Sequence, residues 1–427
     1  MCKRSFDIIK ENIEHLSNTI DLSTKSVILF GVNTSSFKML NYLREKGVIP
    51  KAIIDNNSRF SGKTYLGVPT NTPETVLGNY DKDAIILIVS RFFEEMKEQL
   101  IKMDYTEEQI YQMDNKVDNI KSNSVEEVIE EHKLGLEVYK NIQNEFGEDK
   151  KIIMCPYAGL GDVYFISAYI VSYCEMHNID KFVLTVIGNT NMKIAYMFGI
   201  QNIKIITQSQ SDLLKNFATF LGAKRIGVEI LSHRLISFDN IMYNFEQAGL
   251  LDWGTIFRYG VLEISKNTKP QYITINKESK VVDLLEKIKK RLHRSKTVII
   301  SPYANTIIGM EDGFWEEIVI KLKEKNYEVY TNSIGDNEPI IAGSEPLMFP
   351  IEIAKEVVEY AGIFIGVRSG FCDVIEAAQA QVFVLYPDKR SLFYNLKSMG
   401  FGKHVTECIY NEIWNEEKWL ELMKKEI

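Results

Sequence analysis

One stretch near the C-terminal end limits the choice of fold more than any other. The apolar, β-branched run Ile363–Val367 is followed by the sharp turn Arg368-Ser369-Gly370, and a second apolar run comes at Val382–Tyr386. Between the turn and the second run, apolar residues recur at helical spacing. The pattern predicts a strand, a helix and a second strand, which together form the βαβ unit of a parallel α/β sheet.

Ligands of parallel α/β sheets bind beyond the carboxyl ends of the strands, where this turn is expected to lie. Backbone N–H groups at the start of the helix and the guanidinium of Arg368 favour an anion such as a diphosphate. The alternative is an ordinary turn whose Arg368 pairs with a nearby carboxylate, and the stretch alone leaves both open. The candidate donor-side residues are Arg368, Ser369, Gly370 and Asp373, with Lys389 or Arg390 as a second cation. Asp373 either complements the helix dipole or takes a ribose hydroxyl.

Composition narrows the class of protein. A chain of 427 residues with 45% hydrophobic and 25% charged residues is expected to form two or three globular domains. It has no apolar run of bilayer length and no signal-peptide pattern, so we expect a cytoplasmic protein with at most peripheral membrane contact. The net charge of −8 disfavours nucleic acid as the main partner. Five widely spaced cysteines and six scattered histidines predict reduced thiols, no metal site and no cofactor.

Residues 1–118 predict a Rossmann-like domain that we interpret as accessory. Its opening βαβ unit is a strand at Ser26–Gly31, a helix at Phe37–Lys46 and a strand at Lys51–Asp55. Residues 62–90 continue in a way that resembles small Rossmann-like domains accompanying bacterial sugar-nucleotide and surface-polysaccharide enzymes.

The dinucleotide fingerprint of this first domain is degraded. Only Gly31 matches one of the three glycine positions, while Asn33 and Ser36 occupy the other two. Asp55 ends the second strand where a ribose-binding acid would stand, although an aspartate there is also a common turn former. We therefore predict at most a weak nucleotide site at Gly31, Asn33 and Asp55.

Three further segments complete the predicted organisation. Residues 119–150 predict a helical linker, and two half-domains follow at 151–290 and 291–427. Each half-domain opens with a buried strand and the tripeptide Pro-Tyr-Ala, at 156–158 and again at 302–304. Such a repeat is typical of two related doubly wound sheets, so the predicted fold class is α/β with three Rossmann-like parts. Two more helices are predicted at Phe238–Ala248 and Trp414–Lys425.

From about residue 151 onward the chain resembles GT-B glycosyltransferases. The nearest resemblance is to the ADP-heptose lipopolysaccharide heptosyltransferase family and related bacterial polysaccharide transferases. Its motifs are the Gly159-Leu160-Gly161-Asp162 loop, Ser301-Pro302-Tyr303-Ala304 with Phe314-Trp315 downstream, and the Ile365–Gly370 segment. The family's D-S-G is R-S-G here, and its following histidine is replaced by Cys372-Asp373. An arginine at that place resembles nucleotide-sugar fucosyltransferases, so the donor sugar stays open.

The resemblance implies metal-independent transfer of a sugar from a nucleoside-diphosphate sugar to a glycan or lipid-linked saccharide acceptor. It makes Asp162 the candidate base, whereas the structural alternative is an aspartate that caps the following helix. The acceptor side would hold Tyr157, Gly159 and Gly161, and Tyr303 and Asn305 would face the cleft from the donor side.

Two other functions stay open. The first is a catalytically silent, transferase-like binding subunit of a polysaccharide system. It is suggested by R-S-G in place of the family's D-S-G and by the degraded dinucleotide fingerprint of the first domain. An NAD-using sugar oxidoreductase built on the first domain is disfavoured by the missing glycines and by the lack of a Tyr-x-x-x-Lys pair there. The sequence does not identify the nucleotide base, the sugar, the acceptor, the stereochemical outcome or whether the chain forms a homo-oligomer.

Overall fold

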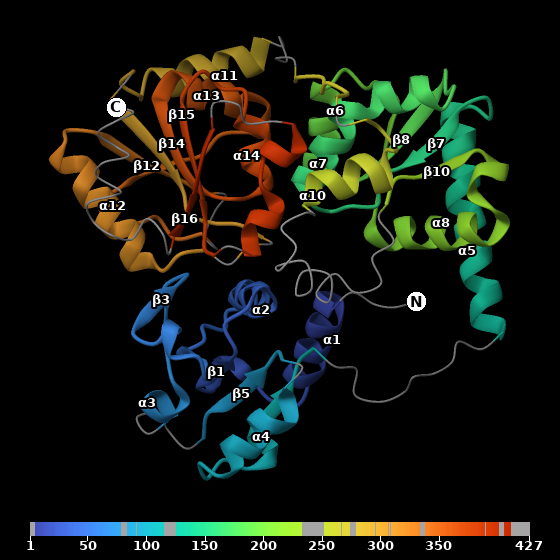
Figure 1. The fold of residues 1–427 in the computed structure, drawn as a ribbon. Helices are drawn as coiled ribbons and strands as arrows, with labels where there is room; N and C mark the ends of the chain where they lie inside the picture. The colour runs from blue at the N-terminus through green and yellow to red at the C-terminus, as the bar shows by residue number, and fades with distance from the viewer. Residues whose placement is uncertain are drawn as a thin grey trace. The chain divides into compact units, whose positions relative to one another are not determined.

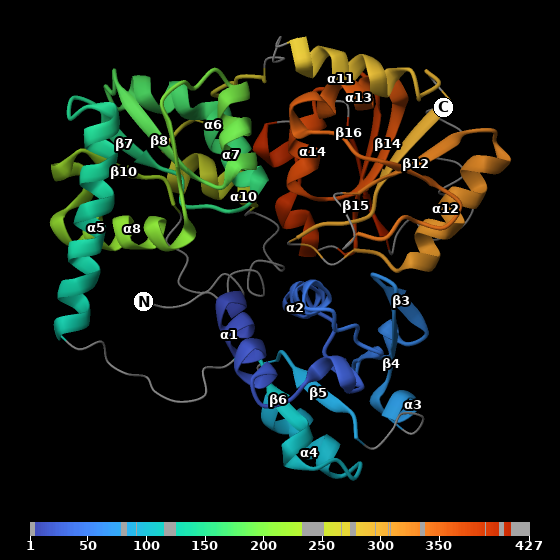
Figure 2. The same cartoon turned by 180° about the vertical axis from the view of Figure 1, so that it is seen from behind.

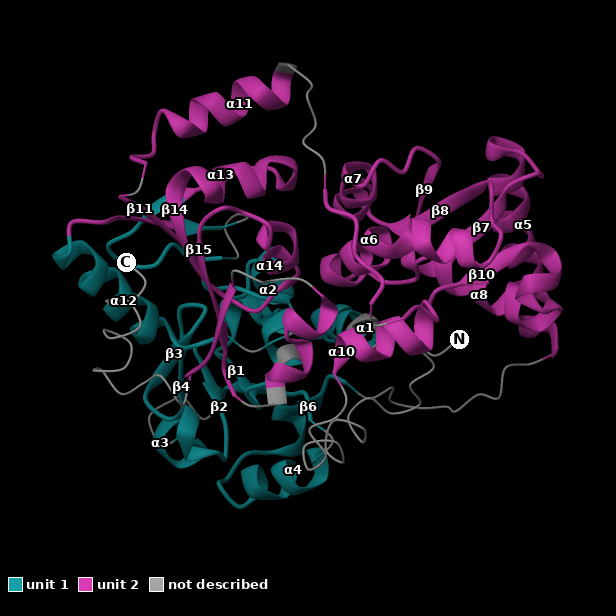
Figure 3. Ribbon diagram, turned by 45° about the horizontal axis from the view of Figure 1, so that its top comes forward, with its two compact units in different colours: residues 1–120, 302–325, 331–346 teal, residues 121–301, 326–330, 347–427 magenta. Residues whose placement is uncertain are grey.

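The computed structural model describes residues 5–77, 83–90, 92–114, 125–232, 252–265, 267–273, 279–294, 296–305, 307, 309–333, 338–388, 390–400 and 405–410. Over these residues the strands form three sheets, and the chain divides into two compact units (Figure 3). Unit 1 consists of Met1–Ile120, Pro302–Lys325 and Thr331–Pro346, and unit 2 consists of Lys121–Ser301, Asn326–Tyr330 and Leu347–Ile427.

The first sheet has the strand order β3-β4-β2-β1-β5-β6. Neighbouring strands are parallel, apart from the antiparallel pair β3 and β4. The strands are β1 (Val27–Phe30), β2 (Ala52–Ile54), β3 (Lys63–Tyr65), β4 (Val68–Asn71), β5 (Ile85–Ile88) and β6 (Ile110–Gln112). The predicted Rossmann-like sheet of the first domain is therefore confirmed.

Helices cover both faces of this sheet because alternate side chains of a strand point to opposite faces (Figure 1). Val27 and Leu29 of β1 join a buried cluster with α1 and α2, whereas Ile28 and Phe30 join another with α4. The helices are α1 (Ser5–Ser17), α2 (Thr34–Glu45), α3 (Pro73–Leu77) and α4 (Phe93–Ile101), with short 3-10 turns η1 (Leu22–Thr24), η2 (Ser58–Phe60) and η3 (Glu107–Gln109).

The second sheet has the order β10-β7-β8-β9, and its strands are all parallel. Its strands are β7 (Lys151–Met154), β8 (Phe182–Ile187), β9 (Ile203–Ile206) and β10 (Val228–Ile230). Its helical elements are α5 (Val125–Phe146), α6 (Leu160–Met176), α7 (Asn189–Met197), α8 (Gln208–Leu221), η4 (Ala223–Ile226), α10 (Trp253–Thr255) and the π-helix η5 (Ile256–Val261).

In the predicted linker, 119–150, the structure has the helix α5 over Val125–Phe146, and this helix is part of the core of unit 2. Val138 and Ile142 of α5 are buried together with Ile152 and Met154 of β7 and with α8. The other face of the same strand, at Ile153, belongs to the cluster that contains α6. Apolar burial on both faces explains why β7 reads as a continuous hydrophobic run.

The third sheet has the order β13-β12-β11-β14-β15-β16. Its strands are β11 (Thr297–Ser301), β12 (Glu328–Asn332), β13 (Glu345–Leu347), β14 (Gly362–Val367), β15 (Gln381–Tyr386) and β16 (Val405–Ile409). The helical segments between or beside them are α11 (Ser279–Lys289), α12 (Asp312–Glu324), η6 (Ile351–Ile353), α13 (Ala354–Ala361), α14 (Gly370–Ile375), η7 (Arg390–Tyr394) and η8 (Lys397–Met399) (Figures 1 and 2).

The βαβ unit predicted around Arg368 is present as β14, α14 and β15, with β14 parallel to β15. Its helix is short and ends at Ile375, although Ala378 is still buried, as its apolar pattern predicted. The helices predicted at 238–248 and 414–425 lie outside the described residues. None of the helices in the described ranges is both long enough and apolar enough to cross a membrane.

Candidate functional site

Two loops of unit 2 leave their sheets where the strand order reverses. In the second sheet the chain runs from β7 outward through β8 to β9, while β10 lies on the other side of β7. In the third sheet the corresponding reversal lies between β11 and β14, which pair in parallel. Such switch points form the crevice in which open α/β sheets bind ligands. The loop to α6, which carries Asp162, and the turn to α14, which carries Arg368, therefore occupy the expected positions.

The N-terminal ends of α6 and α14 touch through two glycines. A Cβ added to Gly370 would lie 2.6 Å from the backbone nitrogen of Gly161, and one added to Gly161 would lie 3.4 Å from the Cα of Gly370. The same Cβ on Gly161 would also come within 2.7 Å of Asp373 Oδ2. Glycine is therefore required at both places by close approach between the two half-domains.

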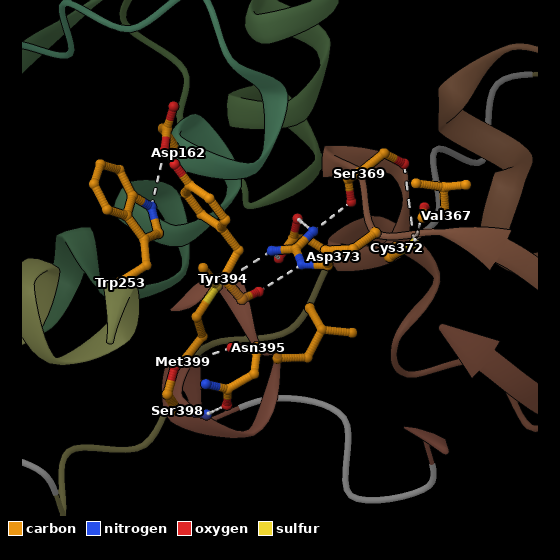
Figure 4. Close-up of polar contacts among 12 residues, drawn as sticks. Asp162, Trp253, Val367, Ser369, Cys372, Asp373, Tyr394, Asn395, Ser398 and Met399 are labelled. Carbon is orange, nitrogen blue, oxygen red and sulfur yellow. Dashed lines mark hydrogen bonds and ion pairs between the residues drawn. The ribbon is translucent and has the colours of Figure 1, made fainter. Parts of the chain in front are cut away.

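Asp162 is partly buried in the first turn of α6, next to Gly161 of this contact. Its Oδ1 accepts a hydrogen bond of 3.0 Å from Trp253 Nε1 (Figure 4). The pKa of Asp162 is raised to about 7: burial is the main cause and the charge of Asp373 adds to it, while the Trp253 hydrogen bond and the charge of Arg368 oppose the rise. A carboxyl group that titrates near neutral pH is suited to exchange a proton with a substrate hydroxyl.

The second oxygen of Asp162 lies over Gly159. A Cβ at Gly159 would be only 2.5 Å from Asp162 Oδ2, so the glycine leaves room for the carboxylate. Tyr157, two residues earlier, is partly buried and its ring lies 5.4 Å from that of Phe257. Of the predicted acceptor-side residues, Gly159 and Gly161 adjoin the Asp162 carboxylate or its helix turn, and Tyr157 packs against the π-helix η5.

Arg368 forms a buried ion pair with Asp373, which is the structural alternative named above. Nη1 lies 2.8 Å from Asp373 Oδ2 and Nη2 lies 3.0 Å from Asp373 Oδ1. The remaining donors bond the carbonyl oxygens of Tyr394, at 2.7 Å, and Ser369, and the sulfur of Met399, at 3.6 Å (Figure 4). Arg368 is 4% exposed and Asp373 is fully buried.

This geometry corrects the predicted role of Arg368 as the diphosphate ligand. A guanidinium has five N–H groups, and the contacts given above provide an acceptor for each of them. A phosphate could bind Arg368 only by displacing Asp373 or the two carbonyl groups. In the structure as it stands, Arg368 therefore positions Asp373 and the turn at Ser369.

The Arg368 ion pair also answers the open question about Asp373. Both carboxylate oxygens of Asp373 accept hydrogen bonds from Arg368. In this structure Asp373 is therefore the ion-pair partner of Arg368, rather than a free group for a ribose hydroxyl or for the dipole of α14 alone. Burial raises the pKa of Asp373, and the charge and hydrogen bonds of Arg368 oppose that rise. Within the pair, the charge of Asp373 raises the pKa of Asp162 and the charge of Arg368 lowers it, so the two partners act on Asp162 in opposite directions.

Trp253 was not singled out by sequence analysis. Asp252 caps its short helix by accepting a hydrogen bond of 2.7 Å from Thr255 N. A Cβ at Gly254 would lie 2.4 Å from the carbonyl of Ser398, so α10 touches η8 of the other half-domain. The Trp253 ring also lies 5.8 Å from Tyr394. Its one local signal is the Asp-Trp-Gly tripeptide, which by itself indicates only a capped turn.

The other donor-side candidates lie elsewhere or outside the described residues. Tyr303 and Asn305 belong to unit 1, where the Tyr303 hydroxyl donates to the carbonyl of Pro339. Lys389 and the side chain of Arg390 are outside the described part of the chain. In the described residues, no three His, Cys, Asp or Glu side chains gather as a possible metal site.

The predicted weak nucleotide site of the first domain uses its polar groups internally. Asp55 Oδ2 accepts a hydrogen bond of 2.7 Å from Val32 N, and Oδ1 accepts one of 2.7 Å from Asn57 N. Asn33 caps α2 through Ser36 N and donates to the carbonyl of Val89. This cap also explains why α2 begins at Thr34, three residues before the predicted start. Gly31 has a positive φ of 109°, which favours glycine without any ligand.

Comparison with known proteins gives a family match for the first domain alone. Residues 23–111 match a family model described as C2185-like, N-terminal. The curated proteins contain no match to this sequence.

Solved glycosyltransferase structures resemble this chain weakly. An E. coli ADP-heptose lipopolysaccharide heptosyltransferase II is 11% identical, with a TM-score of 0.41 over 64% of this chain and 98% of that one. A glycosyl transferase of family 9 from Veillonella parvula is 13% identical, with a TM-score of 0.42 over 65% and 90%. The iron-containing dodecameric glycosyltransferase TibC from enterotoxigenic E. coli is 15% identical, with a TM-score of 0.38 over 58% and 62%. Because all three TM-scores are below 0.5, we base the functional proposal on the chain's own residues.

Proposed function

We propose that this chain is a glycosyltransferase that moves a sugar from a nucleoside-diphosphate sugar to a hydroxyl of a glycan or lipid-linked saccharide. The observation that carries the proposal is Asp162, a carboxyl group with a pKa of about 7 at the switch point of one sheet, facing the helix start at the switch point of the next. The ordered motifs that resemble heptosyltransferases support the same reaction.

In the proposed step, Asp162 takes the proton of the acceptor hydroxyl as the acceptor oxygen forms a bond to the anomeric carbon. The bond between that carbon and the diphosphate oxygen breaks, and the nucleoside diphosphate leaves with the bonding electron pair. Trp253 holds one carboxylate oxygen of Asp162 by a hydrogen bond, which leaves Oδ2 to act as base. A correctly placed base contributes about 10² to 10⁴ in rate.

Because Arg368 is paired with Asp373, we do not assign the diphosphate contact to Arg368 in this proposal. Lys389 and Arg390, predicted from the sequence as cations beside the diphosphate, remain the candidates for that contact. The proposed reaction needs no metal, because the base and the remaining contacts are protein groups.

A measurement of sugar-nucleotide turnover tests this proposal. The full-length chain is incubated with nucleoside-diphosphate sugars and saccharide acceptors, and release of nucleoside diphosphate is measured for the wild type and for Asp162→Asn. The amide keeps an oxygen that can accept from Trp253, so the variant should bind donor normally and lose most of its turnover. Equal turnover in the two proteins would remove Asp162 from the mechanism.

One observation favours a second candidate function, a catalytically silent binding subunit of a polysaccharide system. The arginine that the resemblance places at the diphosphate is occupied by Asp373, and Gly161 and Gly370 are in close contact between the half-domains. A silent subunit would bind saccharide and release no nucleoside diphosphate under any of the conditions above. Any sugar-nucleotide turnover that disappears in Asp162→Asn excludes this function.

A further inference from the structure

Unit 1 contains a pocket whose lining includes neither Asp162 nor Arg368. Its empty volume, including the part open to solvent, is about 620 Å³. Its lining residues come from α2, from the end of β3 and the turn that follows it, from the loop after β11 and from the start of α12, together with Glu338. The first domain and the loop with Tyr303 thus form one concave surface, which is the usual shape of a small-molecule site.

Aromatic rings form part of the pocket wall. Phe37 of α2 and Tyr65 of β3 have ring centroids 5.6 Å apart and planes tilted by 30°. Tyr303 lines the pocket as well, and its hydroxyl is held by the carbonyl of Pro339. Aromatic faces carry a partial negative charge, so they attract the polarised C–H bonds on one face of a sugar ring.

The polar groups that line the pocket include several that accept hydrogen bonds. Asn41 Oδ1 is buried and has no hydrogen-bond partner among the residues described. Asp312 presents a carboxylate fixed by a hydrogen bond of 3.0 Å from Gly67 N to its Oδ2, and Glu338 presents a second carboxylate. A buried acceptor without a donor costs about 1–3 kcal/mol, so a ligand that donates to Asn41 is favoured.

Formal charge argues against an anionic ligand. Lys38 lines the pocket and Arg44 lies close enough to interact with Asp312 and Tyr303, which gives two positive charges. Asp312 and Glu338 give two negative charges, so the sum is zero. Arg44 Nη2 donates to the carbonyl of Leu66, whereas its buried Nη1 has no hydrogen-bond partner among the described residues and can donate to a ligand hydroxyl. A neutral ligand rich in hydroxyl donors fits this balance better than a phosphate does.

We propose that this pocket binds a neutral hydroxylated ring, namely a sugar residue, with one face on the Phe37 and Tyr65 side and hydroxyl groups donating to Asn41, Asp312 and Glu338. The ring could belong to a glycan or be the ribose of a nucleoside. Binding here does not depend on sugar transfer at Asp162. The first domain then contributes directly to saccharide recognition, beyond the accessory role that its sequence predicts.

Titration calorimetry of the full-length protein tests the proposal. The probes are methyl glycosides of glucose, galactose, mannose and N-acetylglucosamine and, in a separate arm, the neutral nucleosides uridine and adenosine. Asn41→Leu removes the unpartnered acceptor, Glu338→Gln removes one carboxylate at nearly constant volume, and Glu311→Gln is the matched control. Glu311 precedes Asp312 and pairs with Lys63 at 3.1 Å, but it does not line the pocket.

At least one neutral probe should bind, and Asn41→Leu and Glu338→Gln should each weaken it by about tenfold, as expected for loss of one hydrogen bond to a buried or charged group. Glu311→Gln and Asp162→Asn should bind like the wild type. Binding of methyl glycosides identifies a glycan residue as the occupant, and binding of nucleosides alone identifies a ribose. Three outcomes would overturn the proposal: no probe binds at about 10 mM, or Asn41→Leu and Glu338→Gln both bind the probe as tightly as the wild type does, or inorganic phosphate is the only compound that binds.

Discussion

The backbone nitrogen of Gly161 lies so close to Gly370 that a methyl group on Gly370 would come within 2.6 Å of it. This contact joins the first turn of α6, which carries Asp162, to the first turn of α14, which carries Asp373. At this contact Asp162 is partly buried, and to a smaller extent the charge of Asp373 acts on it. The high pKa of Asp162 follows from that arrangement.

Gly370→Ala should therefore loosen the junction between the half-domains. The added methyl group meets the backbone of Gly161, which cannot rotate away, and we expect a loss of about 1–3 kcal/mol in the free energy of unfolding. Guanidinium denaturation of the full chain measures this change. Gly313→Ala in α12 is the control, because its Cβ would meet nothing within 4 Å. Equal stability of the two variants would contradict the close contact.

The pH dependence of turnover should follow the ionisation of the Asp162 carboxyl group. A base must be deprotonated to act, so the rate should be low in acid and rise with pH through about 7, the pKa that burial gives this carboxyl group. Initial rates between pH 5 and pH 9 (about two units on either side of that pKa) provide the measurement. A rate that is flat from pH 5 upward would mean that Asp162 is already ionised there.

The same carboxyl group should make the free energy of unfolding fall as the pH rises, whereas the rate of turnover rises. Its pKa is higher in the folded state than the ordinary 3.8, so the folded protein binds the proton more tightly than the unfolded chain does. The contribution of Asp162 to the free energy of unfolding is fully present below about pH 4, and it is lost as the pH rises through about 7. The free energy of unfolding of Asp162→Asn should lack this decline, which is seen by comparing its pH profile with that of the wild type. Parallel profiles would show that the group is not buried as described.

Trp253→Phe should raise the pKa of Asp162 while keeping an aromatic ring in place. The indole N–H stabilises the ionised carboxylate, so its loss favours the protonated form and moves the rising limb of the rate profile to higher pH. Trp315→Phe is the matched control, since the Trp315 Nε1 is buried without a partner among the described residues. A shift of equal size in both variants would trace the effect to packing.

Arg368→Met should destabilise the protein rather than selectively abolish nucleotide binding. It leaves the buried carboxylate of Asp373 without its partner, a change that costs about 3–5 kcal/mol. Lys46→Met, which removes the exposed ion pair of Lys46 and Glu14, should change the stability far less, because solvent screens that pair. Denaturation together with calorimetry on a nucleoside diphosphate separates the two roles. A stable Arg368→Met protein that no longer binds the nucleotide would restore the diphosphate role.

Much of the architecture could be predicted from local pattern. The runs at 26–31, 51–55, 363–367 and 382–386 form strands within a residue or two of the expected bounds, because burial on both faces requires continuous apolar segments. Helix starts were less certain. Asn33 looked like a degraded glycine position and is instead the cap of α2, since one polar side chain can serve either purpose.

The amino-acid sequence by itself determined the α/β fold class, the alternation of strands and helices and the placement of Asp162 and Arg368 after their strands, because these depend on neighbours in the chain. Only the tertiary structure decided what the charged groups do. Whether Arg368 meets a phosphate or Asp373, and whether Asp162 titrates near 4 or near 7, depends on burial and on side chains from another sheet. Trp253 reaches Asp162 only because the chain folds back across 91 residues, which no local pattern encodes.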